Sequence, residues 1–135
     1  LVLDEHLKFD EHCKQLETKL SSCAGMIWRL RNKIPTYVKK KIYQTLFESH
    51  LLYMNVIWGT ACDNVVKPLQ SIQNRALRSV FGLDRRHNRV EMYSHLTENC
   101  LSIRGLNYVL TATYIYRNIH RTIHFNIKFT RNTQR

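Results

Sequence analysis

Near the start of the chain, apolar residues recur in alternating steps of four and three. They form one heptad stripe made of Phe9, Cys13, Leu16, Leu20, Cys23, Ile27, Leu30 and Ile34. Such a stripe predicts an amphipathic helix from about Asp10 to Asn32, and Pro35 ends it. We expect the stripe to pack on neighbouring helices of the same domain, since it lasts only about three heptads, rather than to form a free coiled coil.

A second helix is predicted from Tyr37 to Trp58, with Thr36 as its N-cap and Gly59 after its end. Its apolar positions are Val38, Ile42, Leu46, Leu52, Tyr53, Val56 and Ile57. The run Lys39, Lys40 and Lys41 lies in its first turns. Because these three residues spread around the helix, we expect part of the run to project into solvent.

The stretch "LQSIQNRALRSVFG" predicts a third helix, capped by Asp63 or Asn64 and ending at Gly82. Pro68 is expected in its first turn, where proline is tolerated. Gln73 falls inside the apolar stripe of this helix, so we expect it to be buried with a partner from another helix, because a buried amide without one costs about 1–3 kcal/mol. Arg75 and Arg78 lie on the other side, with Gln70 and Asn74.

The remaining pattern predicts a brief helix from Val90 to Leu96 and a longer one from Ser102 to about Arg121. The opening "LVLDEHLKF" is typical of the end of a β-strand followed by a turn, and we interpret the chain as a piece of something longer. The expected fold is all-α, a bundle of four to five helices with a residual β-strand at the N-terminus. It divides into a strand and turn (1–9), a three-helix bundle (10–83), additional helices packing on that bundle (84–121) and a basic, frayed tail (122–135).

Charge points to the class of partner. The 135 residues include 21 Lys and Arg against 10 Asp and Glu, a formal net charge of +11. Half of the acids lie in the first 17 residues, and the zones from 18 to 47 and after Glu98 contain none. This excess favours a polyanion, either nucleic acid or an anionic membrane surface. The membrane is disfavoured because the basic residues are spread over several helices, and "LLYMNVIWGTAC" is too short to span a bilayer.

No catalytic or metal-binding motif stands out. The cysteines at 13, 23, 62 and 100 form no CxxC pair, and we interpret them as reduced structural residues of an intracellular protein in the nucleus or cytoplasm. His120 and His124 are four apart but lack the Glu of an HExxH site. The glycines are isolated, so no phosphate-binding loop is present. We therefore predict no catalytic residue, no metal site and no cofactor in this chain.

Nucleic-acid binding is better supported, because basic side chains on helix surfaces provide contacts to phosphates. The candidate phosphate-binding residues are Arg29, Arg31, Lys33, Lys39, Lys40, Lys41, Arg75, Arg78, Arg85 and Arg86. Trp28, Tyr37, Tyr43 and Trp58 lie near them on or beside apolar stripes. We expect these aromatic residues to belong mainly to the core.

An ordered series of motifs carries a family resemblance over about residues 1 to 115. The series is "LDEHLKFDEHCKQL", "IWRLRNKIP", "YVKKKIYQTLFESHLLYMNVIWG", "LQSIQNRALRSVFG" and "LSIRGLNYVLTATYIYR". It resembles the region just after the palm in reverse transcriptases of non-LTR retrotransposons, the jockey-like, LINE-type elements. In that family a last palm strand leads into the helices of the thumb.

The resemblance implies an RNA-directed DNA polymerase as the parent protein, with this region gripping the RNA template–DNA primer duplex. It also implies that the rest of the polymerase chain is a partner, and that Mg²⁺ serves the parent enzyme. The family's metal-binding aspartates, usually within [FY]xDD, lie upstream and are absent here, so we do not expect this chain to polymerise. A fragment, a decayed element and a truncated gene product all fit the sequence. A helical module for protein–protein interaction or self-association is the alternative.

Overall fold

The computed structural model describes Leu1, residues 8–84, Tyr93 and residues 101–132, with side chains described no further than Ile119. Its helices are α1 (Asp10–Leu30), α2 (Thr36–Ile42), the π-helix η1 (Tyr43–Glu48), α3 (Ser49–Leu52), α4 (Asn55–Trp58), α5 (Asp63–Phe81) and α7 (Ile103–Asn132). Within these described ranges no strand occurs, which confirms the all-α prediction. The expected N-terminal strand and the helix expected from 90 to 96 fall almost wholly outside the described residues.

Helix α1 confirms the heptad stripe. Six of its predicted positions are buried, namely Phe9, Cys13, Leu16, Leu20, Cys23 and Ile27. Its first turn carries Asp10 and Glu11 and its last turn carries Arg29, the charge order that the helix dipole favours. The stripe packs against α5, and these two helices share the most extensive contact between elements of the fold.

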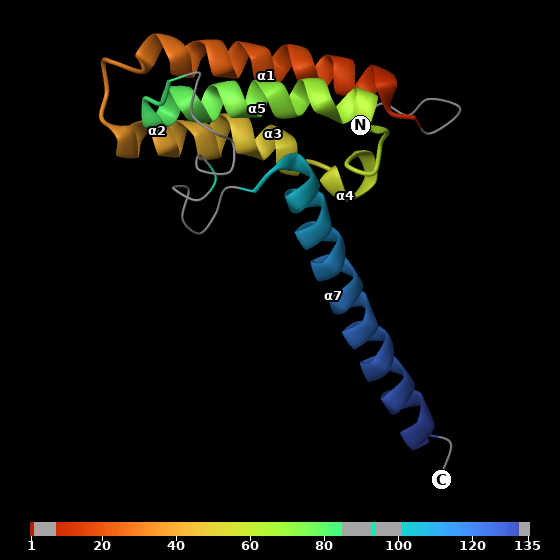
Figure 1. The fold of residues 1–135 in the computed structure, drawn as a ribbon. Helices are drawn as coiled ribbons and strands as arrows, with labels where there is room; N and C mark the ends of the chain where they lie inside the picture. The colour runs from red at the N-terminus through yellow and green to blue at the C-terminus, as the bar shows by residue number, and fades with distance from the viewer. Residues whose placement is uncertain (2–7, 85–92, 94–100, 133–135) are drawn as a thin grey trace.

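The helices lie side by side in a layer-like body (Figure 1). Helices α1 and α5 run in the same direction. The segment α2–η1–α3 follows α1 in the chain and runs in the opposite direction. Leu69, Ile72, Ala76, Leu77 and Val80 form the buried stripe of α5. This stripe packs against α1 and closes the bundle, which confirms that the α1 stripe packs on a neighbouring helix of the same domain.

The segment from Thr36 to Leu52 is helical throughout but changes register at η1. Its N-cap is Pro35, so the assignment of Thr36 as the cap is wrong. In the π-helical turn, hydroxyl groups bond to backbone carbonyls: Thr45 Oγ1 donates to Lys41 O (2.9 Å) and Ser49 Oγ to Thr45 O (2.7 Å). The turn also stacks Tyr43 on Phe47, with ring centroids 5.0 Å apart, and buries both.

The predicted continuous helix to Trp58 is interrupted at Tyr53 and Met54. Met54 adopts a left-handed conformation with φ 54°, and the short helix α4 begins at Asn55. The interruption leaves the Tyr53 carbonyl without its usual helical donor, and the indole N–H of Trp58 bonds to it at 2.8 Å. Trp58 is 0% exposed, so the change of direction places the largest side chain of this segment in the core.

Helix α5 begins one or two residues earlier than expected and ends as expected. Its N-cap is Cys62, not Asp63 or Asn64, and Pro68 therefore lies in the second turn rather than the first. Gly82 is the C-cap with φ 68°, a conformation that glycine adopts without steric cost. The predicted end of the helix is confirmed.

Gln73 is 0% exposed and has the partners that the sequence predicted. Its side-chain amide donates to the hydroxyl of Tyr43 (3.1 Å) and to the carbonyl of Leu101 (2.9 Å). The neighbouring Gln70 accepts a hydrogen bond from the backbone N–H of Ile103 at 2.9 Å, which caps the first turn of α7. These two glutamines of α5 thus fix the start of α7.

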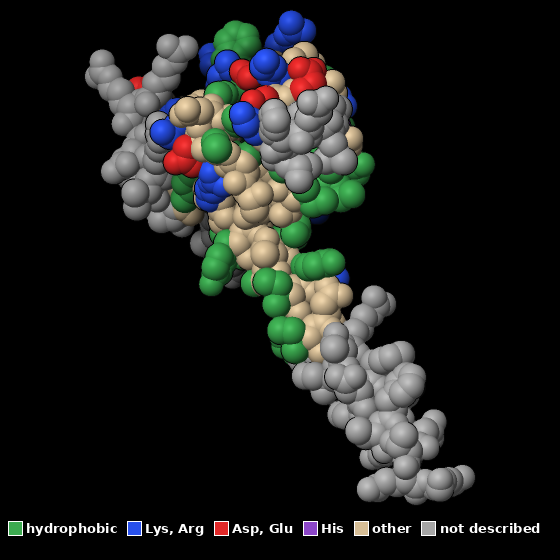
Figure 2. Space-filling model, turned by 90° about the vertical axis from the view of Figure 1, so that its right-hand side faces the viewer, with side chains coloured by type: hydrophobic (Ala, Val, Ile, Leu, Met, Phe, Trp, Pro, Cys, Tyr) green, Lys and Arg blue, Asp and Glu red, His purple; other side chains and the backbone are tan. Residues whose placement is uncertain are grey.

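Helix α7 starts against the body and then projects away from it (Figure 1). It continues to Asn132, although the sequence pattern weakens after Arg121. Arg104 anchors its first turn, donating to the carbonyls of Gly59 (2.6 Å) and Ala61 (2.7 Å) and pairing with Asp63 at 2.7 Å. The Arg104 hydrogen bond and charge lower the pKa of the Asp63 carboxyl. Figure 2 shows hydrophobic side chains along the projecting part of the helix.

We predict that Gly59→Ala destabilises the fold at the α4–α7 contact. A Cβ there would lie 2.5 Å from the carbonyl oxygen of Asn55 and 2.6 Å from Asn107 Nδ2, which itself bonds to that oxygen. Overpacking of this kind costs about 1–3 kcal/mol, and denaturant unfolding measures it.

Gly25→Ala is the matched control. Gly25 lies within α1 and a Cβ there meets nothing within 4 Å, so the exchange should raise the stability by up to about 1 kcal/mol, as helix propensity favours alanine. Equal effects of the two exchanges would show that the close approach at Gly59 is absent.

Candidate nucleic-acid interface

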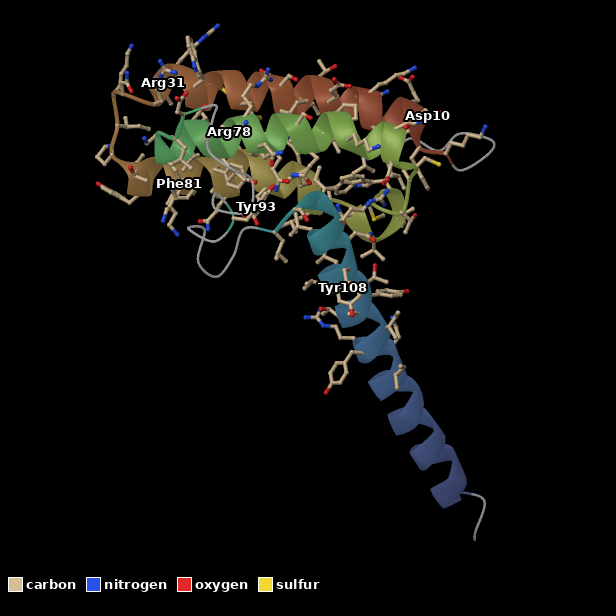
Figure 3. All side chains as sticks on the ribbon, viewed as in Figure 1. Asp10, Arg31, Arg78, Phe81, Tyr93 and Tyr108 are labelled. Atoms are coloured by element: carbon tan, nitrogen blue, oxygen red, sulfur yellow. The ribbon has the colours of Figure 1, made fainter. Side chains whose placement is uncertain are left out.

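The ends of α1 and α5 bring together basic residues that lie far apart in sequence. Arg31 is the C-cap of α1, and Arg78 lies in the last turn of α5. Because the two helices run in the same direction, their C-termini meet at one end of the body. Figure 3 shows Arg31, Arg78 and Phe81 at this end and Asp10 at the opposite end.

A groove of about 520 Å³ lies between these two helix ends, and we call it the basic groove. Its lining comes from the end of α1 and from the last two turns of α5 with the residues that follow, namely Trp28, Arg31, Asn32, Arg75, Arg78, Ser79, Gly82 and Leu83. None of these described lining residues is acidic. The guanidinium carbon of Arg31 lies 4.8 Å from the ring centroid of Trp28, a cation–π contact within α1.

The groove unites three of the residues predicted to bind phosphate, Arg31, Arg75 and Arg78. Arg29, Lys33, Lys40 and Lys41 are exposed and belong to the end of α1, the turn after it and α2, but they do not line the groove. The ammonium of Lys40 lies 5.1 Å from the ring centroid of Phe81, so α2 also reaches this end of α5. The predicted residues Arg85 and Arg86 lie outside the described residues.

Lys39 takes a structural position instead of a surface one. Its side chain is only 6% exposed, and its ammonium donates to the carbonyl oxygen of Arg31 at 3.0 Å. This carbonyl belongs to the end of α1, where helical carbonyls lack backbone donors. The prediction that part of the lysine run projects into solvent is confirmed, because Lys40 and Lys41 are exposed. Lys39, which was also a candidate for phosphate binding, instead points inward with its ammonium bonded to the end of α1.

Two electrostatic effects oppose each other in the groove. The C-terminus of a helix carries about half a negative charge, so two such ends bring about −1 and disfavour an anion. The three guanidinium groups carry a positive charge each and outweigh this. The net effect favours a negatively charged ligand.

The four aromatic residues near the basic side chains were expected to belong mainly to the core, and this holds for two of them. Tyr43 and Trp58 are buried, whereas Trp28 and Tyr37 are exposed. Ile27 occupies the core position of the α1 stripe, so the next residue, Trp28, is turned about 100° away from it. This one-residue offset was the sequence signal that could have placed Trp28 on the surface.

The same described residues include no group of three or more His, Cys, Asp or Glu side chains that could hold a metal ion. Cys13 and Cys23 are buried free thiols, and burial raises the pKa of Cys13 to about 11, which keeps this sulfur protonated and poorly nucleophilic. None of the helices within the described ranges is long and apolar enough to cross a bilayer.

Together these features define an all-α protein with a basic groove at the C-terminal ends of α1 and α5 and a projecting helix that is attached near the start of α5. Over 87 residues the chain is 33% identical to a protein of Drosophila melanogaster named "Probable RNA-directed DNA polymerase from transposon X-element". The similarity covers 62% of this chain and 10% of that protein. It indicates a region related to a transposon reverse transcriptase. No family model matches the chain, and no solved structure matches it.

We predict that Lys39→Ala lowers the stability of the fold, because it removes a buried ammonium that bonds to the end of α1. Hydrogen bonds that involve a charged group contribute about 1.5–3 kcal/mol, and chemical denaturation measures the loss. Lys41→Ala, an exchange at an exposed position two residues away, should change the stability by no more than about 0.5 kcal/mol. A Lys39 variant as stable as the Lys41 variant would contradict the capping role.

Proposed function

We propose that this chain is a region of a non-LTR retrotransposon reverse transcriptase, of the jockey-like, LINE-type kind, that follows the palm and serves as a thumb-like element. Its role is to hold the backbone of the RNA template–DNA primer duplex. It would act in the nucleus or cytoplasm, wherever that duplex is present. The observation that carries the proposal is the basic groove, which gathers Arg31, Arg75 and Arg78 in a chain similar to a transposon RNA-directed DNA polymerase.

The chemistry of the groove suits phosphate. A guanidinium group is planar and can donate two parallel hydrogen bonds to one phosphate. Arg75 and Arg78 lie one turn apart on α5, so their side chains emerge on the same side of the helix. Contacts of this kind fix the position of a duplex without reading its sequence, as a polymerase requires when it moves along a template.

Exposed basic residues extend the positive surface beyond the groove. Arg29, Lys33, Lys40 and Lys41 lie at the same end of the body, in the last turn of α1 and in the connection to and along α2. They would meet phosphates on either side of the one in the groove. The opposite end of α1 carries the acidic residues Asp10 and Glu11. A polyanion would therefore attract the basic end of the body and repel the acidic end, which would orient the protein on it.

The polymerase chemistry itself would belong to other parts of the parent enzyme. The described residues offer no cluster that fits Mg²⁺, so no catalytic step is assigned to them. The chain spans about a tenth of the length of the curated relative that it matches. We propose that the rest of the polymerase chain supplies the aspartates and the metal and is a partner of this region.

A self-association module is the second candidate, and one observation favours it. The projecting part of α7 exposes a series of large apolar side chains, Tyr108, Val109, Tyr114, Ile115, Tyr116 and Ile119. Such exposure is typical of a surface that contacts another protein. The α1 stripe, in contrast, is covered by α5 and is not available to a partner.

The nucleic-acid proposal predicts a strong dependence of affinity on salt. For a fluorescent RNA template annealed to a DNA primer, log affinity should fall with log salt by about 0.7–0.9 per phosphate neutralised. Arg75→Gln should weaken binding and lower this slope by about 1, and anisotropy titrations at several salt concentrations measure both.

Lys67→Gln is the matched control, since Lys67 is exposed on the same helix but lies near its other end. It should leave both the affinity and the slope nearly unchanged. Absence of binding to the primed template, or an affinity independent of salt, would refute the proposal.

The self-association candidate predicts oligomers in the absence of nucleic acid. Sedimentation velocity over a range of protein concentrations should then show a rising sedimentation coefficient, and Ile115→Glu should abolish the rise by placing a charge on the exposed face of α7. A monomer at every concentration would refute this second candidate and leave the first untouched.

A further inference from the structure

We propose that the basic groove binds one unpaired nucleotide, with its phosphate held by Arg75 and Arg78 and its base stacked on Trp28. The inference rests on the proposed function and deepens it, because it assigns single-stranded nucleic acid, in addition to duplex, to this end of the protein. Such a strand is present wherever a template extends beyond its primer.

The two tryptophans of the chain behave in opposite ways. Trp58 is 0% exposed and its indole N–H is bonded to Tyr53, as expected of a core residue. Trp28 is 54% exposed, although an indole gains more than most side chains from burial. A large aromatic surface left in water beside arginines is the arrangement that single-strand binding proteins use, because every base offers a face for stacking.

Arg31 contacts the indole ring of Trp28 and orients it for stacking with a base. Its guanidinium lies over the ring of Trp28, with 4.8 Å between the guanidinium carbon and the ring centroid. This contact holds the ring against free rotation and places a positive charge beside the site. The indole nevertheless keeps more than half of its surface exposed, which leaves area for a base.

The opposite wall of the groove supplies the contacts to phosphate. Arg75 and Arg78 both line it. Their guanidinium groups can donate hydrogen bonds to the oxygens of a phosphate. The groove of about 520 Å³ falls within the range of about 300–1,000 Å³ that holds small organic ligands, a size class that includes one nucleotide.

A base paired within a duplex is not accessible to Trp28, because its faces are covered by the neighbouring base pairs. A duplex can therefore contact the arginines through its phosphates but cannot use the indole. The groove would thus bind two ligands in different ways. A duplex would be bound through its phosphates alone, whereas a single strand would be bound through a phosphate and a stacked base.

Fluorescence of the intact chain tests the inference, since Trp58 is buried and Trp28 is the tryptophan that a ligand can reach. The chain is titrated at one salt concentration with a single-stranded oligonucleotide, with a strand of equal length made of abasic units, and with a blunt duplex. The single strand should quench the emission, whereas the abasic strand and the duplex should bind with little quenching.

Affinity measurements on variants provide the second readout. Trp28→Ala should weaken binding of the single strand by roughly fivefold to a hundredfold, which corresponds to about 1–3 kcal/mol for one stacked base, and should leave binding of the duplex unchanged. Tyr37→Ala is the matched control, because Tyr37 is an exposed aromatic residue outside the groove and its exchange should affect neither ligand.

The outcomes also separate the inference from the proposed function. Equal quenching by the abasic strand, or an unchanged affinity of Trp28→Ala for the single strand, would overturn the stacking site while salt-dependent binding of the primed template persists. Loss of binding to every nucleic acid would overturn both. Since Trp28 is exposed, the variant should keep the circular dichroism spectrum and the Trp58 emission of the native fold, which verifies that it is folded.

Discussion

The packing of α1 against α5 is the constraint on which the rest of the molecule depends. Two apolar stripes with helical spacing must face each other to leave water, and this requirement fixes the rotation of each helix about its axis. Because Ile27 and Leu77 point into the core, the residues that follow them, Trp28 and Arg78, lie at the border of the contact between the two helices. Because the helices also run in the same direction, these residues come together at the C-terminal ends of both helices. The basic groove is thus a consequence of how the core packs.

Directional polar contacts, together with the buried side chains of Ile103 and Leu106, attach the last helix to this core. Gln70 and Gln73 of α5 reach Ile103 and Leu101, and Arg104 reaches back to the carbonyls before α5. Hydrogen bonds depend on direction more than apolar contacts do, so they define the angle at which α7 leaves the body. The exposed apolar side chains farther along α7 have no part in this attachment.

Regular periodicity made much of the fold predictable. The stripe of α1, the end of α5 at Gly82 and the burial of Gln73 all follow from local sequence rules. The break at Tyr53 did not, because it depends on a hydrogen bond to Trp58 that forms only in the folded state. The site was predicted in part, because the sequence gives the charges of Arg31, Arg75 and Arg78 but not their convergence in one groove. The inward position of Lys39 was not predictable from local sequence, since its bond to Arg31 O forms only after the chain turns between α1 and α2.

The length of α7 gives its attachment a mechanical meaning. A continuous helix from Ile103 to Asn132 extends about 45 Å at about 1.5 Å per residue, and Arg104 and Asn107 bond it to the body near its first turns. It therefore has the shape of a lever arm whose fulcrum would be the Arg104 and Asn107 contacts. A rotation of about 10° at this fulcrum would sweep the far end through about 8 Å, by the geometry of a rod of that length. Small adjustments of the contacts at this fulcrum would in this way become large displacements at the far end of the helix.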